Sequence, residues 1–197
     1  MPNQISAVCV FCGSSTGRAP EYLRAATTLG TLLAEEKITL VYGGANRGLM
    51  GAVADACIAA GGRAVGVMPR FLANQEVAHL GLTELHIVES MHERKAKMAT
   101  LADAFIAMPG GFGTLEEYLE TVTWTQLRLQ QKPCGLLNVL GYYDPLLAQA
   151  EKAVEEGFAR PEHRALLIAS ADPKDLLAAM VSTPIQVPAK WVEADKT

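Results

Sequence analysis

Apolar runs alternate with segments of helical spacing from one end of the chain to the other. Each apolar run is short, and the segment after it repeats apolar residues at helical intervals. Strands that alternate with helices form parallel βαβ units, so the pattern predicts an α/β fold with a Rossmann-like, doubly wound parallel sheet flanked by helices. The predicted strands are Ile5–Phe11, Ile38–Tyr42, Arg63–Met68, Glu84–Val88, Ala104–Met108, Cys134–Asn138 and Leu166–Ala169.

The helices predicted between these strands have recognisable ends. Pro20 stands at the start of the first helix, and Gly61-Gly62 follows the second, which are typical start and stop signals. The strands are apolar almost throughout, as expected where helices cover both faces of a sheet. The predicted helices are Pro20–Glu36, Leu49–Ala60, Met91–Leu101, Thr114–Leu129, Pro145–Glu156 and Pro173–Met180.

The chain length of 197 residues fits one domain of ordinary size. We expect a single domain over residues 1–183 and a C-terminal tail over residues 184–197 that straps the surface or frays. The formal net charge of −4 argues against a nucleic-acid partner, which usually meets a basic patch. No apolar run reaches the ~18 residues of a membrane span and no signal peptide is visible, so we expect no membrane association.

The four cysteines are Cys9, Cys12, Cys57 and Cys134. Most of them lie in apolar runs, where a buried free thiol is the simplest interpretation, and this favours a reducing, cytoplasmic location. Cys9 and Cys12 have the spacing of a redox pair, but such a pair normally opens a helix, whereas Cys9 lies in a predicted strand. The four histidines are scattered and no zinc-binding spacing occurs, so we expect no metal.

Ligands of doubly wound sheets bind beyond the carboxyl ends of the strands. The strongest signal at such an end is PGGFGTLEE at 109–117, which follows an apolar run and opens a predicted helix. Glycines allow a ligand close to the backbone, and the free N–H groups at a helix start favour an anion such as phosphate. The alternative interpretation is a capping box, in which Thr114 and Glu117 satisfy the helix start and bind nothing.

Two more loops share this edge of the predicted sheet. The segment 42–51, YGGANRGLMG, also joins a strand to a helix, and its glycines are consistent either with a nucleotide cleft or with tight packing through Gly48 and Gly51. The loop after the first strand contains Ser14 and Ser15, which can donate hydrogen bonds to a ligand or cap the following segment.

The segment 91–98, MHERKAKM, places Arg94 and Lys95 in the first turn of a predicted helix. Cations there oppose the helix dipole, so we expect them to face an anion. Arg94 and Glu117 together suit the cleavage of an N-glycosidic bond, because a carboxylate stabilises the cationic sugar or activates water. We expect Arg94 to lower the pKa of Glu117 and keep it ionised.

Taken together, PGGFGTLEE (109–117), GGANRGLMG (43–51) and HERKAKM (92–98) resemble the LONELY GUY family, formerly labelled lysine decarboxylases. The resemblance runs from Val8 to about Met180 and includes GLLNVLGYYDPLL at 135–147. It implies a Rossmann-like homodimer that hydrolyses N6-modified adenosine 5′-monophosphates, and often AMP, to free base and ribose 5-phosphate without a cofactor. The chain has neither the size nor an obvious lysine for pyridoxal chemistry.

By motif match, the resemblance implies that Arg94 and Glu117 are the catalytic pair and that residues 111–114 hold the 5′-phosphate. Glu76, Lys95 and Thr123 match substrate contacts of the family. Ala45 stands where many members have a glycine. The full set of candidate substrate-binding residues, loops included, is Ser14, Gly44, Met68, Glu76, Arg94, Lys95, Gly111, Phe112, Gly113, Thr114, Leu115, Glu116, Glu117 and Thr123.

Two other functions remain open on the residues alone. A non-catalytic nucleotide-binding module would need the phosphate loop but not Glu117. A nucleosidase for other nucleoside monophosphates would need both and differ in its base pocket. An isopentenyl-type group on N6 would need an apolar recess, which Met68, Met91, Met98 and Trp124 could line because methionine adapts to irregular shapes; the alternative role for each of them is core packing. The choice between a prenylated and a plain adenine stays open.

Overall fold

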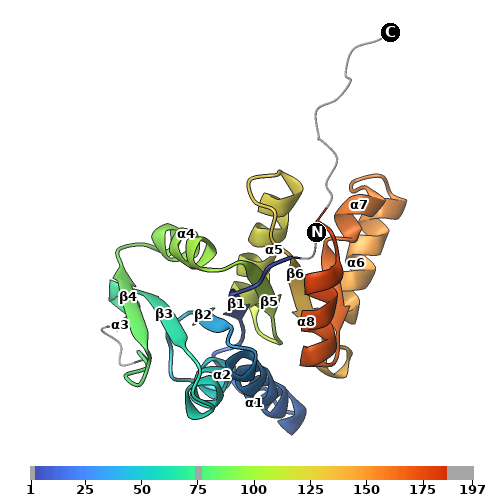
Figure 1. The fold of residues 1–197 in the computed structure, drawn as a ribbon. Helices are drawn as coiled ribbons and strands as arrows, with labels where there is room; N and C mark the ends of the chain where they lie inside the picture. Colours follow the sequence, from blue (N-terminus) through green and yellow to red (C-terminus); the bar gives the residue numbers. More distant parts are fainter. Residues whose placement is uncertain (1–2, 74–76, 186–197) are drawn as a thin grey trace.

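The computed structural model describes residues 3–73 and 77–185, and within them it contains one sheet of seven parallel strands in the order β4-β3-β2-β1-β5-β6-β7 (Figure 1). This confirms the predicted fold class, and each predicted strand is found with its ends shifted by at most two residues. The strands are β1 (Ala7–Phe11), β2 (Thr39–Tyr42), β3 (Ala64–Pro69), β4 (Glu84–Val88), β5 (Ala104–Ala107), β6 (Cys134–Leu137) and β7 (Leu167–Ser170).

The six predicted helices are present, together with three short helical elements that the periodicity did not reveal. The helix predicted from Thr114 begins instead at Phe112 and ends at Gln126, so Thr114 lies inside its first turn and is not its cap. The capping-box interpretation of Thr114 and Glu117 is therefore wrong. The helices are α1 (Pro20–Glu35), α2 (Gly48–Ala59), α3 (Arg70–Ala73), α4 (Met91–Leu101), α5 (Phe112–Gln126), η1 (Val139–Gly141), α6 (Asp144–Glu155), α7 (Pro161–Arg164) and α8 (Pro173–Ser182).

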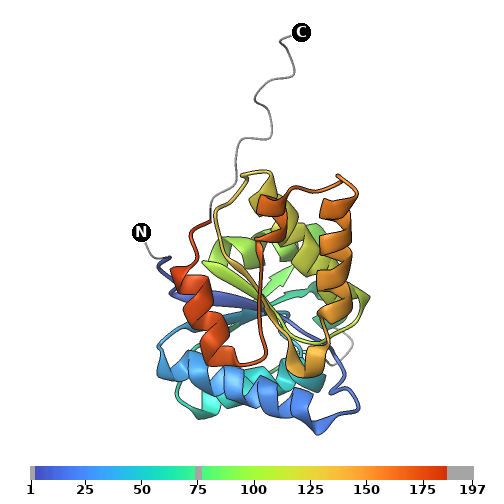
Figure 2. The ribbon, with the colours of Figure 1, turned by 90° about the vertical axis from the view of Figure 1, so that its right-hand side faces the viewer.

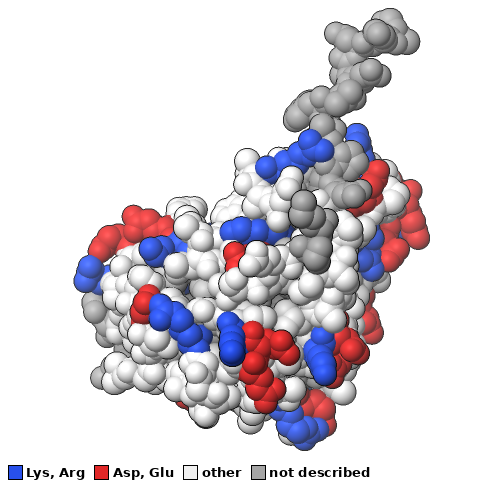
Figure 3. All heavy atoms as spheres, in the orientation of Figure 1, with Lys and Arg blue, Asp and Glu red and all other residues white. Residues whose placement is uncertain are grey.

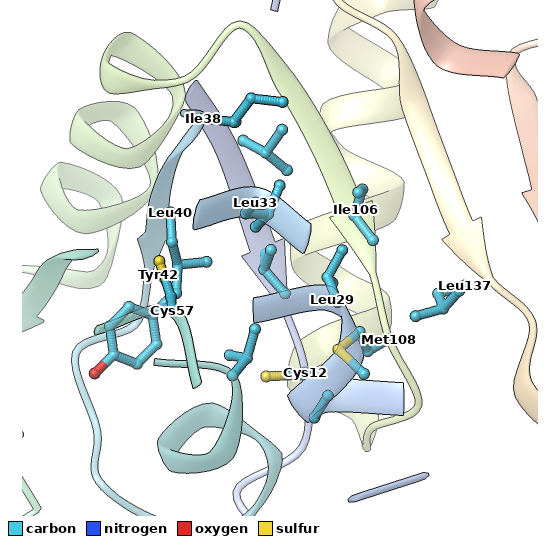
Figure 4. Close-up of a cluster of buried hydrophobic side chains, with 14 of the residues drawn as sticks. Cys12, Leu29, Leu33, Ile38, Leu40, Tyr42, Cys57, Ile106, Met108 and Leu137 are labelled. Atoms are coloured by element: carbon cyan, nitrogen blue, oxygen red, sulfur yellow. The ribbon is translucent and has the colours of Figure 1, made fainter. Parts of the chain in front are cut away.

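The helices cover both faces of the sheet, as Figures 1 and 2 show from two directions. Helices α1, α2 and α8 pack on one face, and α4, α5 and α6 pack on the other. Successive strand residues alternate between the two cores: Val8 and Val10 belong to the first, and Cys9 to the second. Leu29 and Leu33 of α1 point into the first core in Figure 4.

All four cysteines are buried free thiols, which confirms the structural interpretation of Cys9 and Cys12. Among the described residues, no helix is both long and apolar enough to cross a membrane. On the face drawn in Figure 3, basic and acidic side chains lie next to one another. The division into a domain of 1–183 and a tail of 184–197 stays a prediction, and residues 186–197 lie outside the described part of the chain.

The order of the strands reverses between β1 and β5, since β2 to β4 extend to one side of β1 and β5 to β7 to the other (Figure 1). The loops that leave β1 and β5 therefore diverge and leave a crevice. Backbone bonds hold this region together: the Gly13 N–H donates to the Pro109 carbonyl at 3.1 Å, and the Leu49 N–H donates to the Gly13 carbonyl at 3.1 Å. The fold thus brings the three predicted loops to one place.

Candidate active site

A central cavity of about 250 Å³ opens at this crevice. We call it the central cavity, and its walls come from the loop after β1 and the starts of α2, α4 and α5. Its lining residues are Cys12, Gly13, Ser14, Met50, Met91, Arg94, Gly111, Gly113, Thr114, Glu116 and Glu117.

Two further cavities adjoin the central one and share Ser14 with it. The methionine cavity, about 380 Å³, is lined by Met50, Met68, Leu72 and Val77 together with loop residues 43, 45 and 47. The tyrosine cavity, about 390 Å³, lies between the loop of residues 13–17 and the aromatic rings of Tyr22 and Tyr142. The crevice therefore offers one polar space with an apolar space on either side.

Arg94 and Glu117 meet across the central cavity. The Nη1 atom of Arg94 lies 2.9 Å from the Oε1 atom of Glu117, and the two side chains are only 12% and 11% exposed. Arg94 is anchored from behind, because its Nε donates to the Val67 carbonyl at the end of β3 at 3.2 Å. The predicted catalytic pair is thus assembled from α4 and α5 in a geometry fixed by the sheet.

Gly43 makes room for this arginine. A Cβ atom at residue 43 would lie 2.2 Å from the Nη2 atom of Arg94. The glycine after β2 is therefore needed so that the Arg94 guanidinium can pass across the end of the sheet towards Glu117.

The environment of Glu117 differs from the expectation in one respect. Burial raises the pKa of the Glu117 carboxyl, and the neighbouring Arg94 lowers it by less, so that the net direction is upward. Arg94 lowers the pKa of Glu117 as expected, but the sequence reasoning did not take account of the loss of solvent, which outweighs the cation. Burial also raises the pKa of the neighbouring Cys12 thiol, and Glu117 raises it further.

The start of α5, where the sequence predicts anion binding, is uncapped and open. Gly111 is its N-cap and provides no side-chain cap, and the first intrahelical bond runs from the Leu115 N–H to the Gly111 carbonyl at 3.2 Å. The N–H groups of Phe112, Gly113 and Thr114 precede that bond and so lack an intrahelical partner. A Cβ atom at Gly111 or Gly113 would meet nothing within 4 Å, which leaves the backbone open to a ligand.

Lys95 and Arg94 both have anionic partners within the protein. The Lys95 Nζ lies 2.5 Å from Glu116 Oε1 and 3.0 Å from Glu120 Oε2. The prediction that these cations face an anion is confirmed, but the anions are carboxylates of α5. Glu116 is also a wall of the central cavity, so the Lys95 cluster lies beside the catalytic pair.

The other candidate residues are distributed around this centre. Ser14 and Met68 line the adjoining cavities. Gly44 has a φ of +79°, and a Cβ atom there would point towards Leu85 and Gly66 of the sheet. These neighbours indicate that Gly44 packs against the sheet.

Along α5, Phe112 is 93% exposed, whereas Leu115 packs against the core. Thr123 lies on the exposed side of the helix, where its hydroxyl donates to the Leu119 carbonyl at 2.7 Å, and it is not part of the wall of the central cavity. Glu76 falls outside the described residues.

The structure adds residues that the sequence reasoning did not assign to the site. Tyr22 and Tyr142 line the tyrosine cavity, and Arg47, Leu72 and Val77 line the methionine cavity. Tyr142 belongs to the resembling segment 135–147 and Arg47 to the motif 43–51, and these motifs were the available signals. Tyr22, Leu72 and Val77 lie outside the quoted motifs and reach the site only through the fold.

Comparisons with known proteins identify relatives of this chain. A family model described as possible lysine decarboxylase matches residues 50–180. The chain is 54% identical over 170 residues to the probable cytokinin riboside 5′-monophosphate phosphoribohydrolase LOGL5 of Oryza sativa subsp. japonica, covering 86% of this chain and 69% of the relative. It is 51% identical over 176 residues to the cytokinin riboside 5′-monophosphate phosphoribohydrolase of Rhodococcoides fascians, covering 89% of each.

Solved structures with the same fold are more distant in sequence. The molybdenum cofactor binding protein from Rippkaea orientalis superposes with a TM-score of 0.67 at 23% identity, over 89% of this chain and 94% of that one. At this identity the likeness concerns the fold alone. The family model and the relatives at about half identity carry the assignment: this chain belongs to the cytokinin riboside 5′-monophosphate phosphoribohydrolase, or LONELY GUY, family.

Proposed function

We propose that this protein hydrolyses the N-glycosidic bond of adenosine 5′-monophosphates, N6-modified ones included, to the free base and ribose 5-phosphate. The observation that carries the proposal is the buried Glu117 carboxylate, paired with Arg94 at 2.9 Å in the wall of a cavity that the open start of α5 also borders. The names of the relatives at about half identity support the same reaction.

The division of labour follows from the positions of these groups. The N–H groups of Phe112, Gly113 and Thr114 would bind the 5′-phosphate, since they carry the positive end of the helix dipole. That anchor places the ribose beside Glu117. As the bond from C1′ to the base nitrogen breaks, its electron pair leaves with the base, and the Glu117 carboxylate stabilises the positive charge on the sugar. Water then adds to C1′ and gives one proton to Glu117, and the base takes up one proton from solvent to leave as the neutral purine. No cofactor enters this proposal.

The base would then lie on the side of Arg94 and the methionine cavity. Met50, Met68, Leu72 and Val77 offer an apolar surface there, which suits a purine ring and an apolar substituent on N6. Arg94 borders this cavity as well as the central one and would orient the nucleotide between them.

The test is product analysis with a matched pair of variants. Purified protein is incubated with AMP, isopentenyladenosine monophosphate and the two nucleosides, and free base is measured by chromatography. We expect base from the monophosphates only. Glu117→Gln should reduce turnover by at least ~100-fold while ribose 5-phosphate still binds.

Glu151→Gln is the control, because Glu151 forms an Arg–Glu pair of the same 2.9 Å length with Arg164 on the surface. It should leave turnover unchanged. Nucleotide binding without base release in the wild-type protein would favour the non-catalytic binding module, and near-normal turnover in Glu117→Gln would refute the assigned role of the carboxylate.

We also propose that the protein is a cytoplasmic homodimer formed through the outer face of α5. Leu119 on this helix and Leu127, its C-cap residue, are 41% and 43% exposed, and with Thr123 they recur at intervals of four residues, which places them along one side of the helix. A partner on this side would lie against Thr123, for which the family resemblance predicts a substrate contact although it does not line the central cavity of its own chain. Sedimentation velocity should show a dimer that Leu127→Glu dissociates.

A further inference from the structure

Three successive carbonyl groups before α5 are each held by a different part of the fold. The Tyr143 hydroxyl donates to the Met108 carbonyl at 2.6 Å, the Gly13 N–H donates to the Pro109 carbonyl at 3.1 Å, and the Tyr142 hydroxyl donates to the Gly110 carbonyl at 2.5 Å. The turn that leads into the anion-binding helix start therefore has all three of its acceptors turned towards the protein.

The bond from Tyr142 differs from the other two in what it controls. In a trans peptide the carbonyl and the following N–H point in opposite directions. Fixing the Gly110 carbonyl therefore also fixes the direction of the Gly111 N–H, away from Tyr142. Gly111 borders both the central and the tyrosine cavity, so the orientation of this one peptide decides whether a donor or an acceptor faces the crevice.

This peptide is also the one most free to turn over. Both of its flanking residues are glycines, and without Cβ atoms they reach backbone conformations that other residues avoid. A turned peptide would present a carbonyl oxygen where an N–H is needed, and the oxygen would repel an anion at the start of α5.

The turn that carries Tyr142 is fixed by its neighbours, although Tyr142 itself is 40% exposed. Asn138 donates to Asp144 Oδ1 at 2.7 Å and accepts from the Tyr143 N–H at 2.7 Å, which closes the turn around η1. Leu140 takes a left-handed conformation at φ +54° within that turn, which side-chain-bearing residues rarely adopt unless their surroundings impose it. The Tyr142 ring meets the Tyr143 ring edge to face at a centroid distance of 5.1 Å.

We propose that Tyr142 is a positioning residue for the anion cradle: its hydroxyl keeps the Gly110–Gly111 peptide turned so that the Gly111 N–H joins the free N–H groups at the start of α5. The inference rests on the proposed function in one respect, which is that the anion in the reaction is the 5′-phosphate of the substrate. Tyr142 touches no reacting atom and acts through the backbone of the loop.

Tyr142→Phe and Tyr143→Phe form a matched pair that tests this. Each removes one hydroxyl that donates to a carbonyl of the same loop. The Met108 carbonyl belongs to the peptide that leads into Pro109, whose nitrogen carries no hydrogen, so Tyr143 orients no donor. Tyr143 is almost fully buried, and its variant should lower the melting temperature while leaving anion affinity unchanged.

The measurements are calorimetric titration with inorganic phosphate and steady-state kinetics with AMP. We expect Tyr142→Phe to weaken phosphate binding and to raise KM about tenfold, with kcat within about threefold of wild type. Tyr143→Phe should keep both phosphate affinity and KM within about twofold of wild type.

Unchanged phosphate affinity in Tyr142→Phe, or an equal loss in Tyr143→Phe, would overturn the role of Tyr142. Wild-type protein that fails to bind phosphate would overturn it as well. A wild-type protein that binds phosphate but releases no base would contradict the catalytic proposal alone, and the titrations would still decide whether Tyr142 positions the cradle.

Discussion

The loop of residues 109–113 and the loop of residues 43–51 both follow a buried strand and lead into a helix at the same edge of the sheet, yet their glycines face different surroundings. In the first loop, Gly110 packs closely against Thr114, whereas a Cβ atom at Gly111 or Gly113 would meet nothing within 4 Å. In the second, a Cβ atom at Gly43 would lie 2.2 Å from Arg94, and one at Gly48 would lie 2.3 Å from the Ser14 carbonyl carbon.

The difference shows that glycine-rich loops can serve a site in two ways. The loop at 109–113 leaves the backbone at Gly111 and Gly113 open to a ligand. The loop at 43–51 lets other parts of the protein come close: Gly48 leaves room for the loop after β1, and Gly43 leaves room for Arg94. From the sequence, the glycines of the second loop were consistent either with a nucleotide cleft or with tight packing. The structure favours tight packing, which brings together the elements that line the cavities.

The largest effect that this comparison predicts is on folding, at Gly48. Gly48→Ala would force a side chain into a left-handed backbone conformation at φ +58° and against the backbone of Ser14 and Ser15. We expect the free energy of unfolding to fall by at least about 3 kcal/mol, measured by urea denaturation.

Gly61→Ala separates the two contributions, because Gly61 has φ +80° but open space around it. It should lose only about 1 kcal/mol, the cost of the left-handed conformation. Equal losses in the two variants would mean that the close approach of Gly48 to Ser14 is unimportant.

The next effect is on catalysis, at Gly43. In Gly43→Ala the methyl group displaces the end of the flexible Arg94 side chain, so the fold survives and the Arg94–Glu117 pair is broken. We expect kcat/KM to fall about 100-fold with little change in melting temperature. Steady-state kinetics with AMP as substrate measure this.

A double-mutant cycle decides whether the loss runs through the arginine. In an Arg94→Ala background, Gly43→Ala should cost less than about threefold more. A full 100-fold loss in that background would show that Gly43 supports activity by another route.

These glycines also mark how far sequence reasoning reaches. The strands and the longer helices follow from local periodicity, and so their positions could be predicted closely. The one-turn elements α3, η1 and α7 could not, since elements of this length carry too little periodic pattern and depend on tertiary contacts. The loop glycines could be recognised as important, but the neighbours of each glycine could not be predicted. The partner of Gly43, for example, comes from a helix that is distant in sequence.

The candidate site shows the same limit. Arg94 and Glu117 could be predicted as a pair because the residue types suit the chemistry and their motifs follow strand ends. The upward shift of the Glu117 pKa could not, because it arises from burial, which depends on packing from every side. Tyr142 could be noticed in its motif, but its bond to the Gly110 carbonyl appears only when β6 lies next to β5.

A smaller effect, on binding, is expected at Gly111. Its φ of −89° and ψ of −159° are accessible to any residue, and nothing in the protein opposes a methyl group there. Gly111→Ala should therefore keep the melting temperature within ~2 °C of wild type. The methyl group would occupy the space beside the free N–H groups and raise KM for AMP about tenfold. An unchanged KM would place the phosphate elsewhere.

The smallest effect that we predict is a shift in the pH dependence of kcat/KM. This shift tests whether both loops influence the Glu117 carboxylate. Burial raises the pKa of Glu117 and Arg94 opposes this. Because the reaction needs the carboxylate, kcat/KM should fall on the acidic side at a higher pH than an ordinary glutamate would give.

Displacing Arg94 in Gly43→Ala removes an influence that lowers the pKa of Glu117, so this pKa rises further and the acidic limb of the profile moves to higher pH. In Gly111→Ala the pair is intact and the limb should stay at its wild-type position. If the limb moved equally in both variants, or in neither, the separation of the two loops into one that holds the arginine and one that holds the phosphate would be wrong.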